Sequence, residues 1–317
     1  MCKKTIKCLL LTAVSLFIIS SGVMKTHAQP DSPPELDGGA EDPERVRNPV
    51  SNFILQERYP ETVYLQGAQT DNKVALTFDD GPDPRFTPQL LDVLKEHNVK
   101  ATFFLMGARA AAYPDLIQRI INEGHIIGNH TYWHPNLVEA GDIETLEREI
   151  MQTEDILNVV IGYRTKLFRA PYGFLDNEIV EKLISLNYTV VGWSVDSLDW
   201  QELPPVQIAD NVLSNLHPGA IILMHDGADW EGDRTNTIEA LRQIIPEIRE
   251  QGLAFETVPQ LLIRLWSLSL HKYSHTRCLL LTNWRSKSPI IKCNAINSTA
   301  DTSIAFGTLK RCKFAIK

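Results

Sequence analysis

The chain has 317 residues, of which 44% are hydrophobic and 22% are charged, and this length suits one large domain or two small ones. Its formal net charge at pH 7 is −8, but residues 1–28 carry +4 and residues 271–317 carry +8, which leaves −20 for residues 29–270. Because nucleic-acid phosphates need basic contacts, a segment this acidic argues against a nucleic-acid partner.

The first 28 residues are typical of an export signal. Lysines at positions 3, 4 and 7 precede a nearly continuous apolar run over residues 9–23, and Thr26-His27-Ala28 offers a cleavage site. At about 15 residues the run is shorter than the roughly 20 of a membrane-spanning helix, which favours a cleaved signal peptide over an N-terminal membrane anchor. Either one places the rest of the chain outside the cytoplasm: secreted, associated with the cell wall or anchored facing outward.

Residues 29–72 are predicted to be a linker and lead-in segment. Residues 30–50 hold five prolines and several acids with little apolar content, which is typical of a flexible tether.

From Lys73 onward, short apolar runs alternate with segments of helical periodicity. Buried strands that alternate with helices indicate parallel pairing through right-handed crossovers. The pattern predicts an α/β fold, a distorted (β/α) barrel of about seven parallel strands, with a doubly wound open sheet as the alternative. The expected strands are residues 74–78, 102–106, 125–128, 167–169, 189–194, 220–224 and 254–257. The expected helices contain residues 90–94, 116–121, 143–157 (with Asp142 as N-cap), 179–184, 208–216 and 238–248.

Two adjacent carboxylates, Asp79 and Asp80, stand at the end of the first expected strand, in the sequence Thr-Phe-Asp-Asp-Gly-Pro. Consecutive side chains of an extended chain point to opposite sides, so one carboxylate could bind a metal while the other accepts a proton. Asp-Asp-Gly-Pro is also a good turn sequence, and the pair alone does not decide between the two interpretations.

Two histidines, His130 and His134, follow another apolar run. If that segment is helical, their spacing puts both imidazoles on one face, where they can bind the same metal ion. With Asp80 as the third ligand, they would form a two-histidine, one-carboxylate site that leaves positions open for water and substrate.

Three more polar clusters also come directly after apolar runs. In a β/α barrel the loops that follow the strands converge on one face, where catalytic residues collect, so five clusters in this position indicate a single site. The three clusters are Arg169-Ala170-Pro171-Tyr172-Gly173, Asp196-Ser197-Leu198-Asp199-Trp200 and Leu223-Met224-His225-Asp226.

In this order, the five clusters resemble the motifs of the polysaccharide deacetylases, the NodB-homology group or carbohydrate esterase family four. The similarity runs from about Lys73 to Arg264, and no motif residue that the family needs for activity is missing. It implies that residues 73–268 form a catalytic domain that removes N-acetyl groups from an amino-sugar polymer, such as peptidoglycan or chitin, and releases acetate and a free amine.

The resemblance also implies a ligand set and a base. Asp80, His130 and His134 would hold a divalent metal, usually Zn²⁺ with Co²⁺ or Mn²⁺ as alternatives, which would polarise the acetamide carbonyl and lower the pKa of a bound water. Asp79 would be the general base, oriented by a bidentate ion pair with Arg169.

The remaining roles implied by the resemblance concern the oxyanion, the leaving group and the substrate. The backbone N–H of Tyr172 would stabilise the oxyanion. His225 would protonate the leaving nitrogen, with its pKa raised by Asp199. Apolar contacts with the substrate would come from Trp193, Leu223 and Pro171.

Two other functions fit the same residues. An O-acetyl ester presents its carbonyl to a metal as an amide does, so an O-acetyl esterase of a wall polymer is one alternative, and a non-catalytic wall-binding protein of the same fold is the other. A monomer is expected, with an N-acetylated polysaccharide as its partner. Residues 269–317 are predicted to be a basic, poorly ordered tail, whose three cysteines (Cys278, Cys293 and Cys312) allow one disulfide plus a free thiol.

Overall fold

The computed structural model describes residues 49–140, 142–263, 278–281 and 290–293. The predicted signal peptide or anchor (residues 1–28), the first part of the predicted linker and most of the basic tail lie outside the described residues. None of the described helices combines the length and the apolar character that crossing a bilayer requires.

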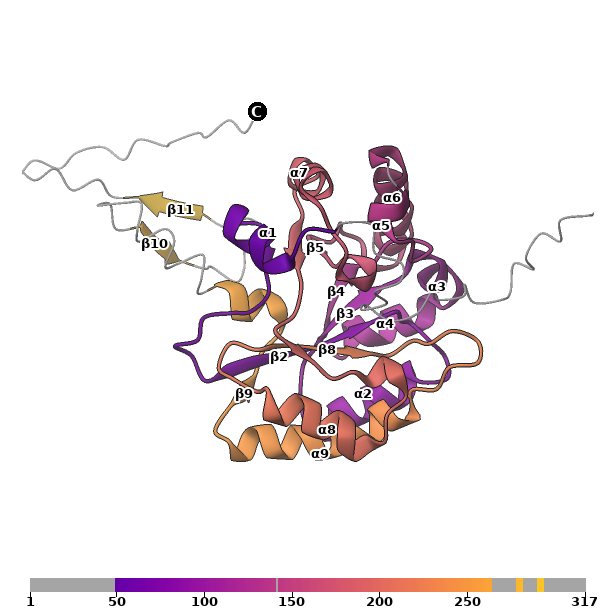
Figure 1. Ribbon diagram of the computed structural model, residues 1–317, viewed down its shortest axis with the longest axis vertical. Helices are drawn as coiled ribbons and strands as arrows, with labels where there is room; N and C mark the ends of the chain where they lie inside the picture. Colours follow the sequence, from indigo (N-terminus) through magenta and orange to yellow (C-terminus); the bar gives the residue numbers. More distant parts are fainter. Residues whose placement is uncertain (1–48, 141, 264–277, 282–289, 294–317) are drawn as a thin grey trace, which may run out of the picture. The chain divides into compact units, whose positions relative to one another are not determined.

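A parallel sheet forms the centre of the described part of the chain (Figure 1). Its strands follow the order β1-β6-β5-β4-β3-β2-β8-β7, and β9 pairs with the start of β2. The strands are β1 (Val63–Tyr64), β2 (Lys73–Asp79), β3 (Thr102–Leu105), β4 (Ile126–Asn129), β5 (Leu167–Phe168), β6 (Thr189–Val191), β7 (Val195–Asp196), β8 (Ile221–His225) and β9 (Ala254–Phe255).

The connection between β6 and β7 shows that this sheet is curled. The two strands are six positions apart in the strand order, which in a flat sheet would separate them by about 29 Å. Only residues 192–194 join them, and four residue steps span at most about 14 Å. The sheet must therefore bend round until its two ends approach each other, which confirms the predicted distorted barrel.

Helices cover the outside of the curled sheet. Helix α9 packs against α8 and α2, and α6 packs against α3, α4 and α7; Figure 1 shows α2, α8 and α9 together on one side of β2 and β8. The helices are α1 (Asn52–Arg58), α2 (Thr87–Glu96), α3 (Gly107–Ala112), α4 (Pro114–Asn122), α5 (Leu137–Ala140), α6 (Ile143–Ile161), α7 (Asn177–Ser185), α8 (Pro205–Ser214) and α9 (Thr235–Glu250).

The alternation of side chains along β2 and β8 separates the core from the site. Val74, Leu76 and Phe78 of β2 belong to the large apolar cluster under the helices, as do Ile222 and Met224 of β8. The intervening residues of both strands therefore face the other side, the inside of the barrel. The last of these inward positions are Asp79 and His225, which are register partners in the parallel pair.

All seven expected strands are present in the structure, and each expected helix matches α2, α4, α6, α7, α8 or α9. Asp142 caps α6 as predicted, with its side chain accepting a hydrogen bond from the backbone N–H of Thr145. Helices α1, α3 and α5 and strands β1 and β7 were not expected. Of these, α1 and β1 lie within residues 49–72, before the main run of strands, and β1 pairs with β6.

Within the described parts of the tail, β10 (Cys278–Leu281) pairs antiparallel with β11 (Ile290–Cys293), and Cys278 is the register partner of Cys293.

Candidate active site

Asp79 and Asp80 reach the same cavity through a local backbone turn. Asp79 is the last residue of β2, and Asp80 follows it in the left-handed region at φ 74°. Regular alternation would turn Asp80 away from Asp79, but the left-handed conformation brings both buried carboxylates to the cavity. The two side chains thus differ in their neighbours rather than in the side of the strand they face.

The imidazoles of His130 and His134 meet at the Asp80 carboxylate. Asp80 Oδ1 lies 3.3 Å from Nε2 of His130 and 3.3 Å from Nε2 of His134. All three side chains are buried, and their nearest ligand atoms lie within 4.8 Å of one another. Asp80 Oδ1 has no hydrogen-bond partner among the described residues, which is what a bound cation would satisfy.

The local structure around the two histidines differs from the helix that their spacing suggested. Residues 130–134 form a loop after β4, in which Thr131 and His134 have φ values of 66° and 61°. The segment is therefore not helical, and a loop instead brings the two imidazoles to one ligand position. Thr131 Oγ1 accepts a hydrogen bond from the His134 backbone N–H at 3.1 Å and so fixes this turn.

The protonation of the triad suits a metal. His130 Nδ1 lies 2.9 Å from the carbonyl oxygen of Arg169, to which it can only donate, and this leaves Nε2 unprotonated in the neutral ring. Burial lowers the pKa of His134 to about 3, so its imidazole is neutral. Burial opposes ionisation of Asp80, but the neighbouring histidines hold the pKa of its carboxyl well below the usual range.

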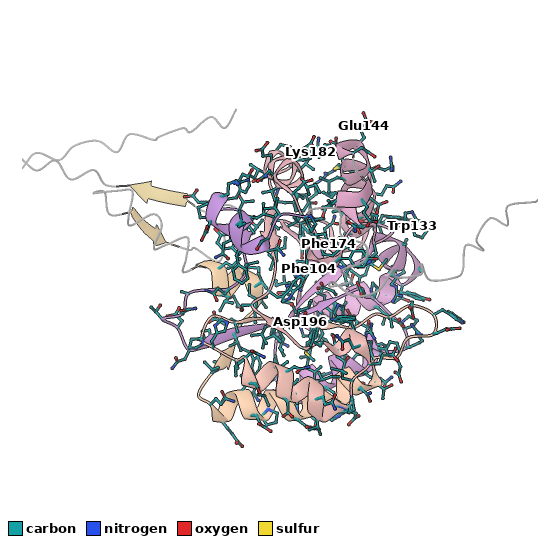
Figure 2. The ribbon with its side chains drawn as sticks, viewed as in Figure 1. Phe104, Trp133, Glu144, Phe174, Lys182 and Asp196 are labelled. Atoms are coloured by element: carbon teal, nitrogen blue, oxygen red, sulfur yellow. The ribbon has the colours of Figure 1, made fainter. Side chains whose placement is uncertain are left out.

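Arg169 holds Asp79 through a single contact. Its Nη1 donates to Asp79 Oδ1 at 2.8 Å, whereas Nε and Nη2 donate to the carbonyl oxygens of Val191 and Gly192. The expected bidentate ion pair is therefore not formed, because the other donors are committed to the end of β6. The guanidinium also lies over the ring of Phe104, 4.2 Å from its centroid. Phe104 belongs to β3 and is labelled in Figure 2.

His225 forms the second charged pair, with Asp199. The Nδ1 of His225 lies 2.7 Å from Asp199 Oδ1, and Asp199 Oδ2 accepts from the backbone N–H of His225 and from Thr237 Oγ1. Burial by itself lowers the pKa of His225, but the carboxylate of Asp199 outweighs it and raises the pKa to about 9. A pKa of about 9 favours the protonated imidazole near neutral pH, with Nε2 as its second ring nitrogen.

Tyr172 has a strained backbone at φ 60° and ψ 2°, inside the short turn Pro171–Gly173. Its ring packs edge-on against that of His134, with centroids 4.7 Å apart. Asp80, His134 and Tyr172 thus all have left-handed backbones, which a folded chain retains only where the surroundings enforce them, as at functional sites.

The cavity has a volume of about 350 Å³ and is lined by eight of the eleven residues expected at the site. Arg169 and Asp199 lie behind it, each in contact with a residue that lines it. Pro171 is buried and does not line the cavity. The other two expected substrate contacts, Trp193 and Leu223, do line it. The eight are Asp79, Asp80, His130, His134, Tyr172, Trp193, Leu223 and His225.

The cavity wall also includes residues that sequence reasoning did not identify. Gln201 and Glu202 follow Trp200, which belongs to a predicted cluster but had no assigned role, and Asp229, Gly232 and Arg234 lie in the segment between His225 and α9. The only signal for them was their position directly after a motif, at the end of an apolar run.

A curled parallel α/β barrel with this ligand set at the carboxyl ends of its strands has the arrangement of a metal-dependent enzyme. Comparison with known proteins identifies the family. A family model described as "Polysaccharide deacetylase" matches residues 66–191.

Individual relatives extend the match beyond that range. A peptidoglycan-N-acetylglucosamine deacetylase of Bacillus cereus is 45% identical over 209 residues, which cover 66% of this chain and 74% of the relative. A chitooligosaccharide deacetylase of Rhizobium leguminosarum bv. trifolii is 36% identical over 208 residues, 63% of this chain and 96% of the relative. The crystal structure of the Bc1960 peptidoglycan N-acetylglucosamine deacetylase is similar with a TM-score of 0.64 and 42% identity, covering 67% of this chain and 97% of that one. The chain belongs to the polysaccharide deacetylase family, and it is a polysaccharide N-deacetylase, a hydrolase of amide bonds.

Proposed function

We propose that this protein removes the acetyl group from N-acetylglucosamine units of peptidoglycan, outside the cytoplasm, with Zn²⁺ at Asp80, His130 and His134. The observation that carries the proposal is the juxtaposition of this triad with a second carboxylate, Asp79, and the imidazole of His225 in one cavity. The choice of polymer is supported by the 45% identity to the peptidoglycan-N-acetylglucosamine deacetylase of Bacillus cereus.

The donor set favours zinc. Two neutral imidazoles and one carboxylate are ligands that catalytic zinc sites use, and three protein ligands leave a position for water or substrate. Zinc bound there would polarise the acetamide carbonyl and acidify the attacking water. Co²⁺ and Mn²⁺ accept the same donors and are the alternatives.

Asp79 is positioned to remove a proton from that water. Its Oδ1 is held by Arg169, and its Oδ2 lies 3.8 Å from His130 Nε2, beside the position the three ligand atoms share. Oδ2 therefore lies where it could accept a proton from a water at the proposed metal. The backbone N–H of Tyr172 is the proposed donor to the oxyanion, with the strained turn fixing its direction.

His225 is positioned to give the proton that an amine leaving group needs. Asp199 keeps Nδ1 of the ring occupied, so Nε2 is the nitrogen that carries the transferable proton. Trp193 and Leu223 line the same cavity and form apolar contacts for the acetyl methyl group.

The proposed place of action rests on the lysine-rich start and apolar run of residues 1–28, which lie outside the described residues, and on the wall polymer that the relative's name specifies. We propose export with the catalytic domain facing the cell wall, as a secreted or membrane-anchored enzyme.

The test is acetate release by the purified, zinc-loaded full-length protein from peptidoglycan fragments, from chitin oligomers and from O-acetylated peptidoglycan fragments, with Asp79→Asn as the control. Faster release from peptidoglycan by the wild type, absent in the variant, is the expected result. Faster release from chitin would overturn the choice of polymer. Release from O-acetylated fragments alone would establish the esterase alternative instead.

A further inference from the structure

We propose that Trp230 is a stacking platform for a sugar unit next to the one being deacetylated, on a loop that Arg85 holds rigid at the rim of the cavity. The inference rests on the proposed function, because it names how the same site binds a polymer. The loop consists of residues 227–233, between β8 and α9.

The size of the cavity implies contacts outside it. Its volume of about 350 Å³ is near the lower end of the roughly 300–1,000 Å³ of ligand pockets, so it suits one acetylated sugar. The next units of a polymer must then lie across the rim. Asp229 and Gly232 line the cavity, and Trp230 stands between them in sequence, with 69% of its surface exposed.

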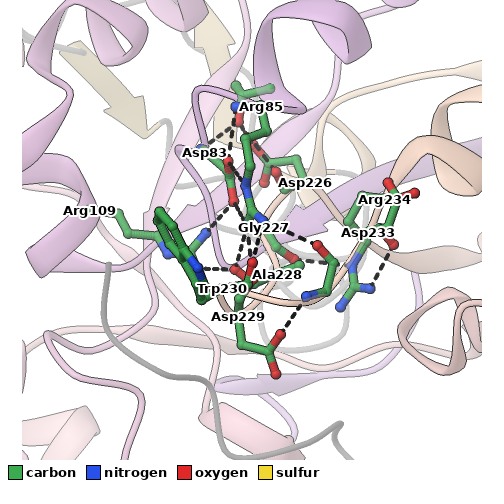
Figure 3. A network of polar contacts seen from close by, with 12 residues as sticks. Asp83, Arg85, Arg109, Asp226, Gly227, Ala228, Asp229, Trp230, Asp233 and Arg234 are labelled. Carbon is green, nitrogen blue, oxygen red and sulfur yellow. Dashed lines mark hydrogen bonds and ion pairs between the residues drawn. The ribbon is translucent and has the colours of Figure 1, made fainter. Parts of the chain in front are cut away.

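The backbone of this loop is unusually well held for a surface loop. The guanidinium of Arg85 donates to four of its carbonyl oxygens, at distances between 2.9 and 3.2 Å. The four acceptors are Ala228, Asp229, Trp230 and Gly232. Figure 3 shows the loop wrapped around this side chain, with Trp230 labelled.

Arg85 is itself fixed from the opposite side. Its Nε and Nη2 bind the two oxygens of Asp83 at 3.0 and 2.7 Å, and Asp83 also pairs with the buried Arg109 at 2.9 Å. Arg109 donates in turn to the carbonyl oxygen of Ala228. Arg234 Nε donates to the Gly227 carbonyl oxygen at 3.1 Å, and Gly232 N–H donates to Asp229 Oδ1 at 2.7 Å.

This network fixes the backbone from which the indole of Trp230 projects. A single exposed aromatic side chain is ordinary on a protein surface, but here its backbone is fixed in place next to the residues that line the cavity. The flat apolar face of an indole packs against the C–H faces of a pyranose ring, and a fixed platform loses little conformational freedom on binding. The exposed carboxylate of Glu231 on the same loop can accept hydrogen bonds from sugar hydroxyls.

The test compares wild type, Trp230→Ala and Trp230→Phe for acetate release from N-acetylglucosamine oligomers of increasing length. Tyr163→Ala is the matched control, because Tyr163 is a 48% exposed aromatic residue in the turn before β5, at the end of the strands opposite the site. We expect Trp230→Ala to lower kcat/KM by about five- to tenfold on the longest oligomer, mainly through KM, with a loss that grows with length. Trp230→Phe should recover most of it, and Tyr163→Ala should match the wild type.

A binding measurement separates this proposal from the proposed function. Asp79→Asn with and without Trp230→Ala is titrated calorimetrically with the longest oligomer, and the double variant is expected to bind about five- to tenfold more weakly. Equal affinities, or a wild-type length dependence in Trp230→Ala, would overturn the platform while leaving deacetylation intact. A wild type that binds through Trp230 but releases no acetate would instead overturn the proposed function.

Discussion

Asn52, the first residue of α1, donates a hydrogen bond from Nδ2 to the carbonyl oxygen of Gly173 at 3.1 Å. Gly173 directly follows Tyr172, the proposed oxyanion donor. A second hydrogen bond, from Val50 N–H to the Leu175 carbonyl oxygen at 2.9 Å, joins the same two segments. Asn52 thus supports the turn that directs the Tyr172 N–H. It does so from more than a hundred positions away and from outside the range that the family model matches.

Replacing Asn52 with aspartate tests whether this contact positions the oxyanion donor. Aspartate has nearly the same shape but no N–H, so a carboxylate would face the Gly173 carbonyl oxygen and repel it. We expect kcat to fall about tenfold, short of the roughly 10²–10³-fold loss of an entire oxyanion donor, with KM, zinc content and melting temperature nearly unchanged. Phe53→Ala, the next residue on α1 and 71% exposed, is the control. Unchanged kcat in Asn52→Asp would show that the turn holds its own shape.

Asp79→Asn should abolish turnover and retain the metal. The amide side chain fills the same space beside Arg169 but cannot accept the proton of the attacking water, and general-base catalysis typically contributes about 10²–10⁴-fold. Asp79 is not one of the three clustered ligands, so the zinc content should equal that of the wild type. Elemental analysis and steady-state acetate release are the measurements. Wild-type turnover in this variant would remove Asp79 from the role of base.

His130→Ala should lose metal and activity together. His130 contributes Nε2 to the triad and is held in the required tautomer by the Arg169 carbonyl oxygen. Changes in residues that merely support a ligand already cost about 10–100-fold in metal affinity, so removal of a ligand should cost at least about 100-fold. His217→Ala, a histidine before the start of β8, is the control that leaves affinity unchanged. Full zinc occupancy of His130→Ala would mean that the ligand set is wrong.

The sequence predicted the parts of this molecule that depend on regular periodicity. Alternating apolar runs located all seven expected strands, and the motif spacing located the residues that line the cavity. What it missed depends on contacts between distant segments. The two-residue strand β1 is too short to show periodicity, and it exists because it pairs with β6.

The local errors around the site have the same origin. Spacing suggested a helix for His130 and His134, but the pair is formed by a loop with left-handed residues that ordinary propensity disfavours. Similarly, the sequence paired Arg169 with Asp79 but did not show that the pair has a single contact. The other donors of Arg169 bind the carbonyl oxygens of Val191 and Gly192, and no local pattern reveals those contacts.

We expect the pKa of His225, which Asp199 raises, to set the alkaline limit of activity. Because Asp199 raises the pKa of His225 to about 9, the proton donor is intact at neutral pH and is lost as the pH rises through that value. The carboxylate of Asp80 also raises this pKa, and a bound cation would offset its contribution, so the limit should lie at or somewhat below pH 9 in the metal-loaded enzyme.

Asp199→Asn removes the attraction and leaves burial, which lowers the pKa of His225, as the dominant effect. The alkaline limb of kcat/KM, measured between about pH 6 and about pH 10, should therefore move to lower pH, with a fall in kcat at pH 7. The pair also stabilises the fold below the ordinary histidine pKa of about 6.5, and this contribution disappears as the pH rises through the folded-state value of about 9. The unfolding free energies of wild type and variant, measured in denaturant, should accordingly differ most below about pH 6.5 and approach each other as the pH rises toward about 9. An alkaline limb at the same pH in both proteins would show that another group controls it.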